Sequence, residues 1–133
     1  MGAWGVSLFE NDDAMDWAVD FQHEPSEQSL RAAFEAAAAV DGYLERDVGS
    51  YALAAAEVIA AARGKPCRGI PQALRDWAAA NPGVATPELR AHALAAIERV
   101  MIEESSEVAE LWATTKDAAE WETQIDDLRN RLS

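Results

Sequence analysis

Apolar residues recur at helical spacing over most of the chain, and the first such run follows Asn11. Side chains three and four positions apart form one apolar face, whereas the aspartates of this run fall largely on the other side. The apolar positions are Ala14, Trp17, Ala18 and Phe21. Asn11 is a suitable N-cap, and Pro25 ends the pattern. The pattern therefore predicts an amphipathic helix.

Start and stop signals divide the rest of the chain into further helices. A second helix is expected to run to about Val40, where Asp41 and Gly42 interrupt the pattern. Residues suited to N-cap positions stand before three of the later segments: Ser26, Thr86 and, in a loose capping box with Asp117, Thr114. No strand-like alternation of useful length accompanies these patterns.

The segment from about residue 50 to 63 is apolar nearly all round, with Glu57 as the main interruption. A helix without a polar face is expected at the centre of a helical domain, and Gly64 is a plausible residue to end it. We therefore predict an all-α fold, in which a bundle of six or seven helices surrounds this central helix. A chain of 133 residues has the usual length of one domain, here spanning residues 1–133.

Two tryptophans stand close to the start of the chain. Trp4 lies between Gly2 and Gly5, and Trp17 lies on the apolar face of the first helix. Such a tryptophan could anchor an interface, because large aromatic residues dominate binding hot spots. A tryptophan flanked by glycines is more often a packing plug, which is the reading that we favour for Trp4.

The chain is strongly acidic, with 24 Asp and Glu residues against 11 Lys and Arg residues and a formal net charge of −13. This balance disfavours nucleic acids and anionic membranes as partners, because both reward basic residues. A basic protein would be a better partner, although the charge could simply keep the protein soluble. The longest nearly apolar run, residues 52–62, is much shorter than the roughly 20 residues that span a bilayer.

Cys67 is the only cysteine, which excludes an intrachain disulfide and fits a reducing cytosol. No Lys or Arg precedes Arg31, so a positively charged signal-peptide region is missing and we expect a cytoplasmic protein. Cys67 stands beside Lys65 and Arg68, which could lower its pKa, but a reactive thiol usually needs a base or a helix terminus as well. The same loop cations could bind an anion, or could offset a helix C-terminus and nearby acids.

The candidate partner contacts are four aspartates of the first helix: Asp12, Asp13, Asp16 and Asp20. Asp12 and Asp13 fall in the first turn, where the helix dipole favours negative charge. Asp16 and Asp20 lack this compensation unless a cation of the middle loop folds back on them. The four therefore form either an acidic surface for a basic partner or an ordinary solvated face.

The sequence offers no catalytic triad, phosphate loop or strong metal-ligand spacing, and we predict no catalytic residue, metal or cofactor. Two acid–histidine pairs have helical spacing, Asp20 with His23 and Glu88 with His92, and could in principle meet around one cation. Pairs of this kind are more often exposed ion pairs.

The opening GAWGVSLFENDDAMDW resembles the start of an uncharacterised bacterial family, domain of unknown function 4259, through its Gly-x-Trp-Gly, Asn-Asp-Asp-Ala and Asp-Trp elements. The tail is similar too, with SSEVAELW followed by EWETQIDDLRNRL. The resemblance implies a bacterial, soluble and mainly helical protein. It implies no activity, because none is established for the family.

Two functional hypotheses follow. The first is a small acidic interaction module that masks a basic protein surface, as an inhibitor or immunity-type partner would. The second is an enzyme or a small-ligand or metal binder with a carboxylate site near residues 11–16. Carboxylates lining a closed pocket would favour the second hypothesis, and a convex acidic face would favour the first. The oligomeric state stays open, because alanine-rich helices can pack within one chain or across a dimer.

Overall fold

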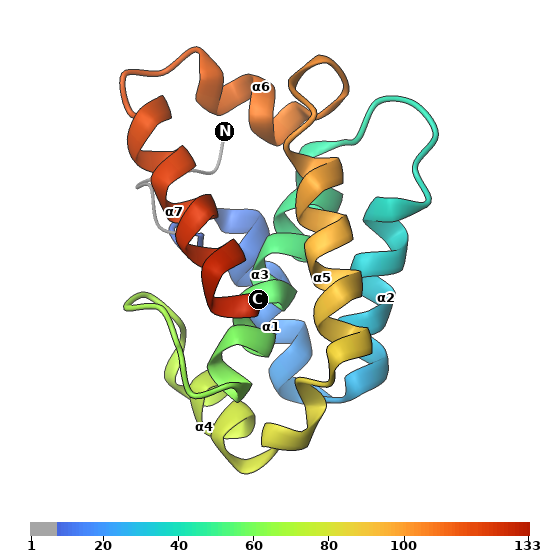
Figure 1. The fold of residues 1–133 in the computed structure, drawn as a ribbon, viewed down its shortest axis with the longest axis vertical. Helices are drawn as coiled ribbons and strands as arrows, with labels where there is room; N and C mark the ends of the chain where they lie inside the picture. Colours follow the sequence, from blue (N-terminus) through green and yellow to red (C-terminus); the bar gives the residue numbers. More distant parts are fainter. Residues whose placement is uncertain (1–7) are drawn as a thin grey trace.

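The computed structural model describes residues 8–133, and this part of the chain folds into seven α-helices (Figure 1). The helices are α1 (Asp12–His23), α2 (Glu27–Ala38), α3 (Arg46–Ala62), α4 (Gln72–Ala80), α5 (Pro87–Val100), α6 (Glu107–Ala113) and α7 (Ala118–Leu132). Two short 3₁₀ turns, η1 (Pro82–Val84) and η2 (Glu103–Ser105), flank α5. The predicted all-α bundle is confirmed. The Trp4 prediction lies outside the described residues.

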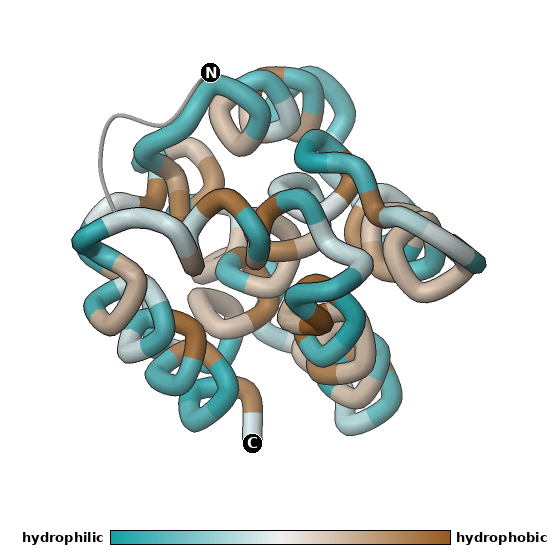
Figure 2. The backbone as a smooth tube through the Cα atoms, turned by 90° about the horizontal axis from the view of Figure 1, so that it is seen from above, coloured by the Kyte–Doolittle hydropathy of each residue, from teal (hydrophilic) through white to brown (hydrophobic). Residues whose placement is uncertain are grey.

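Helix α3 is the centre of the bundle, as its sequence predicts. All six other α-helices pack against it, and each of its residues from Ala52 to Ala62 is buried. Small alanine side chains let the neighbouring helix axes approach closely. Seen from above, many outward-facing turns of the surrounding helices carry hydrophilic residues (Figure 2). The core is therefore built on one apolar helix and the apolar stripes of its six neighbours.

Helix α3 begins at Arg46, four residues before the predicted start at about residue 50. The predicted start left Gly49 outside the helix, but Gly49 and Ser50 both lie buried inside it. A Cβ atom on Gly49 would lie 3.0 Å from the Cγ2 atom of Val108 in α6. The glycine thus lets α6 approach α3 and does not break the helix.

The end of α3 follows its prediction. Gly64 has a φ of 83°, its N–H donates to the carbonyl of Ala61 at 2.9 Å, and the N–H of Lys65 donates to that of Ala60 at 3.0 Å. This pair of bonds is a Schellman motif, in which glycine adopts the left-handed conformation at little cost. The helix consequently ends where the sequence places its stop, and the following loop turns back.

Three of the predicted caps are formed. Asn11 accepts a hydrogen bond from the Ala14 N–H at 2.8 Å, and Ser26 and Thr86 accept from the third residue of their helices at 3.1 Å. The predicted capping box before α7 is wrong: the Thr114 hydroxyl donates to the carbonyl of Leu111, and Asp117 makes no capping bond. Here the hydroxyl closes the end of α6 and does not open α7. No helix in residues 8–133 combines the length and hydropathy that a membrane span needs.

Candidate functional site

The aspartates of α1 divide into one that is paired and three that face solvent. The carboxylate of Asp13 accepts a hydrogen bond from the Arg46 guanidinium at 2.8 Å, which joins the start of α1 to the start of α3. Asp12, Asp16 and Asp20 are exposed, and within residues 8–133 no ion pair involves any of them. The predicted acidic stripe is thus one structural anchor beside three solvated carboxylates.

Tyr51 of α3 shows that carboxylates from two helices share one surface. Burial raises the pKa of Tyr51, and the negative charges of four aspartates raise it further: Asp47, Asp13, Asp16 and Asp20. Asp47 was not among the predicted contacts, because α3 was predicted to start after it. We call the exposed carboxylates of Asp12, Asp16, Asp20 and Asp47 the acidic face.

Most basic residues of the protein are bonded internally. Seven of the 11 basic residues are held by carboxylates or backbone carbonyls: Arg31, Arg46, Arg63, Arg90, Arg99, Arg129 and Arg131. Three of these bind main-chain oxygens only or chiefly: Arg63, Arg90 and Arg99. Arg46, which is bonded to Asp13, is a cation beside the acidic face, and its charge also acts on Asp47. The carboxylates of Asp12, Asp16 and Asp20 form no ion pair within residues 8–133.

A buried ion pair joins the middle of α3 to the end of α7. Arg131 donates to both carboxylate oxygens of Glu57, at 2.7 and 3.0 Å, and the Glu57 side chain is only 2% exposed. Arg131 also contacts Asp127 at 2.8 Å and the carbonyl of Lys65 at 3.1 Å. Burial alone would lower the pKa of Arg131, but the bonds to Glu57 and Asp127 outweigh it and raise the pKa. The arginine is therefore charged at all accessible pH values.

Arg63, at the start of the middle loop, binds the end of α7 and does not fold back on α1. Arg63 donates to the backbone carbonyls of Arg131 and Ser133, and Arg90 donates to that of Leu132 at 3.1 Å. Cations are favourable at a helix C-terminus, where carbonyl oxygens lack helical partners. Arg63 therefore supports the prediction that the loop cations offset a helix C-terminus. That helix is α7, however, and not α3, whose C-cap is Arg63 itself.

Cys67 lies against this buried pair. Burial, reinforced by the charge of Glu57, raises the pKa of Cys67 to about 12. The thiol is consequently protonated at neutral pH and is not an activated nucleophile. The charges that act on the thiol are those of Glu57, which raises its pKa, and of Arg131, which lowers it.

The two acid–histidine pairs do not meet in a metal site. Glu88 accepts a hydrogen bond from Arg31 at 3.0 Å, and Asp20 and His23 both face solvent. No group of three or more His, Cys, Asp or Glu side chains in residues 8–133 is arranged to hold a metal ion.

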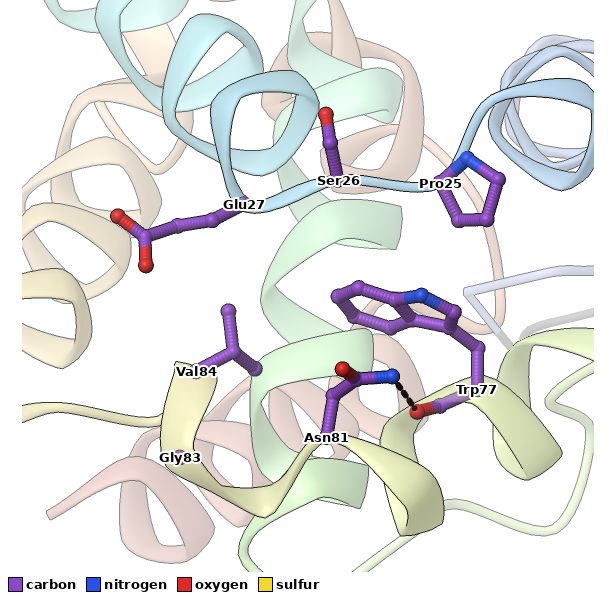
Figure 3. A pocket seen from close by; sticks show the side chains of 7 residues that line it. All are labelled: Pro25, Ser26, Glu27, Trp77, Asn81, Gly83 and Val84. Carbon is purple, nitrogen blue, oxygen red and sulfur yellow. Dashed lines mark hydrogen bonds between the residues drawn. The ribbon is translucent and has the colours of Figure 1, made fainter.

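An open cleft lies where the turn between α1 and α2 faces the end of α4 and η1 (Figure 3). Its volume is about 390 Å³. Apolar and polar side chains share the lining, which consists of Pro25, Ser26, Glu27, Trp77, Asn81, Gly83 and Val84. None of the predicted aspartates lines this cleft. Helical periodicity puts Trp77 on the apolar face of α4 and gives no signal for its exposed side.

Comparison with known families supports the likeness seen in the sequence. The model of the family described as "Domain of unknown function (DUF4259)" matches residues 2–124. The chain belongs to this family. The DUF4259 match includes the acidic face and the cleft, whereas Arg131 of the buried pair lies beyond it. No curated protein and no solved structure matches the chain.

Proposed function

We propose that this DUF4259 protein is a bacterial, cytoplasmic interaction module whose acidic face binds a basic protein. Binding would mask the basic surface of the partner, as an inhibitor or immunity-type protein does. The carboxylates of Asp12, Asp16 and Asp20 are the expected contacts, and Asp47 extends the surface onto α3. Asp13 has a supporting role, because its ion pair with Arg46 fixes α1 against α3.

The observation that carries the proposal is the contrast between paired cations and unpaired carboxylates. The protein carries a net charge of −13, yet most of its arginines are bonded internally. Asp16 and Asp20 are one helical turn apart and repel each other by a few tenths of a kcal/mol. A basic partner would relieve this repulsion and would be attracted from a distance, which speeds association.

The geometry gives less support to a carboxylate-based enzyme or metal site. Asp16 and Asp20 face solvent, and none of the four predicted aspartates lines the cleft described above. Carboxylates that act as general acids or bases usually sit where burial shifts their pKa. We therefore develop the interaction proposal alone.

The test compares two variants with equal net charge. In the first, Asp16→Asn and Asp20→Asn neutralise the acidic face; in the second, Glu104→Gln and Glu122→Gln neutralise two exposed carboxylates on η2 and α7. Each protein is immobilised and used to capture partners from a bacterial lysate at low and high salt. We expect the wild type and the second variant to retain a basic partner that salt releases, and the first variant to lose it.

The captured protein is then purified, and its association rate is measured against salt concentration for all three forms. A partner that both variants bind equally weakly would indicate attraction to net charge alone and would contradict a specific acidic face. The absence of any salt-sensitive basic partner would contradict the proposal itself.

A further inference from the structure

The cleft of Figure 3 lies at the end of α1 that carries the last carboxylates of the acidic stripe. Asp20 is followed one turn later by Glu24, the C-cap of α1, and Pro25 is the first residue of the cleft lining. Both carboxylates are exposed. A basic segment that follows the acidic stripe along α1 would reach the cleft at its end.

An aromatic side chain forms one wall of the cleft and is held by a ladder of rings. The rings of Trp77 and Phe21 meet at 89° with their centroids 5.1 Å apart, and Trp17 stacks on Phe21 at 5.0 Å. Figure 3 shows the indole of Trp77 extending into the cleft between Ser26 and Asn81. The cleft therefore contains a preorganised π surface, which attracts cations by its electron-rich face.

The polar side chains of the lining present acceptors to the cleft. The Nδ2 atom of Asn81 donates to the backbone carbonyl of Trp77 at 2.8 Å, which leaves the amide oxygen of Asn81 as the acceptor toward the cleft. The Ser26 hydroxyl is occupied, because it accepts from the Ser29 N–H and bonds to the Ser29 hydroxyl, both at 3.1 Å. Glu27 adds a carboxylate, and no lining residue is basic.

We propose that this cleft binds an arginine side chain of the basic partner. The planar guanidinium would stack on the indole of Trp77 and donate to the amide oxygen of Asn81. The Glu27 carboxylate, which points away from Trp77 in Figure 3, would add negative charge at the rim of the cleft. Arg31 contacts one oxygen of Glu27 at 3.2 Å and also binds Glu88, so the other Glu27 oxygen stays available. This inference rests on the proposed function, to which it adds the residue type that the partner inserts.

The probe is N-acetyl-arginine methylamide, titrated into the full chain labelled with ¹⁵N. The Trp77 indole N–H signal, assigned from a Trp77→Phe variant, reports occupation of the cleft. N-acetyl-citrulline methylamide is the matched control, because citrulline has the shape of arginine without its charge. We expect a weak but saturable shift of the Trp77 signal with the arginine amide and little shift with the citrulline amide. Equal shifts with both, or none with the arginine amide, would overturn the inference.

Variants of the cleft provide a second test that does not depend on removing the tryptophan. Glu27→Gln should weaken binding of the arginine amide about two- to fivefold, the effect of one exposed ion pair. Glu122→Gln on α7 loses the same charge outside the cleft and should leave the affinity unchanged. Equal weakening by both variants would reduce the effect to net charge and count against an arginine site.

The two proposals can fail separately. If a captured basic partner depends on Asp16 and Asp20 but the arginine amide leaves the Trp77 signal unmoved, the cleft inference is wrong and the acidic interaction module stands. If the arginine amide binds at Trp77 but no salt-sensitive partner exists, the proposed function is wrong and the cleft is a site for a small cationic ligand.

Discussion

Two charged regions of this protein use the same residue types in opposite ways. At the end of α7, Glu57 and Arg131 form a buried pair, and Arg63 and Arg90 bind the last backbone carbonyls. On the acidic face, Asp16 and Asp20 stand exposed and form no ion pair within residues 8–133. The charges of the first region hold α7 to α3, whereas the charges of the second are exposed and free to contact a partner.

The difference follows from where each charge lies relative to the core. Burying a carboxylate removes its hydration, so Glu57 is tolerated only because Arg131 meets both of its oxygens. An exposed aspartate keeps its hydration and needs no partner to be stable. Pairing is therefore obligatory at the end of α7 and optional on α1, which predicts very different responses to substitution.

The largest effect is expected from Arg131→Ala. The substitution leaves the Glu57 carboxylate buried without its partner and should lower the free energy of unfolding by about 3–5 kcal/mol. Urea denaturation followed by circular dichroism measures this loss. A loss of less than about 1 kcal/mol, the usual contribution of an exposed ion pair, would show that water reaches Glu57.

A double substitution provides the control for this prediction. Glu57→Met together with Arg131→Met removes both charges and fills much of the same space. Because no charge remains buried alone, the double variant should be far more stable than Arg131→Ala and close to the wild type. If it were as unstable as the single variant, the pair would be stabilising in its own right, beyond avoiding an unpaired charge.

The thiol of Cys67 probes the same buried region. Its pKa is raised from 9.0 to about 12, so thiolate is scarce at neutral pH. Labelling by a thiolate-specific reagent should be at least about a hundredfold slower than for a free-cysteine peptide, measured by absorbance. Labelling at the rate of the peptide would contradict the burial beside Glu57.

The raised pKa also predicts a pH dependence of stability. The folded protein favours the protonated thiol, so this contribution is fully present below pH 9 and is lost as the pH rises toward about 12. A Cys67→Ala variant lacks the titrating group, and its stability should fall less over this interval.

Local features of the fold could be predicted from the sequence, whereas long-range pairings could not. The caps at Asn11 and Ser26 and the stop at Gly64 act through neighbouring backbone groups, so a few residues of sequence contain the whole interaction. The pair of Glu57 and Arg131 joins positions 74 residues apart. Its only sequence signal was a single charge inside an otherwise apolar helix.

The candidate sites show the same limit. The exposed aspartates of α1 could be predicted because helical periodicity places them opposite the apolar stripe. Asp47 was missed because the helix was predicted to start at about residue 50. The cleft was missed because Trp77, Asn81 and Pro25 come together only in the folded chain. Sequence periodicity predicts which residues of one helix are exposed, but not which residues of other elements lie opposite them.

A smaller effect is expected from Gly49→Ala, which tests the start of α3. Alanine would favour the helix by about 1 kcal/mol, but its Cβ atom would press on Val108 at 3.0 Å. We expect a net destabilisation of about 1 kcal/mol by urea denaturation, since overpacking of a core outweighs helix propensity. Adding Val108→Ala should relieve the contact and remove part of the loss. A more stable Gly49→Ala protein would show that α6 can move away freely.

The smallest effect on stability is expected where the functional effect should be largest. Asp16→Asn with Asp20→Asn removes a like-charge pair one helical turn apart and should raise the free energy of unfolding by about 0.2–0.5 kcal/mol. Addition of salt should remove this gain, because exposed charges are screened. Urea denaturation at low and high salt measures both. A clear loss of stability would mean that the two aspartates hold the fold together, and the acidic face would then resemble the end of α7. If the variant is as stable as the wild type or slightly more stable, and no longer retains a basic partner, Asp16 and Asp20 serve binding. The charges at the end of α7 would then serve stability alone.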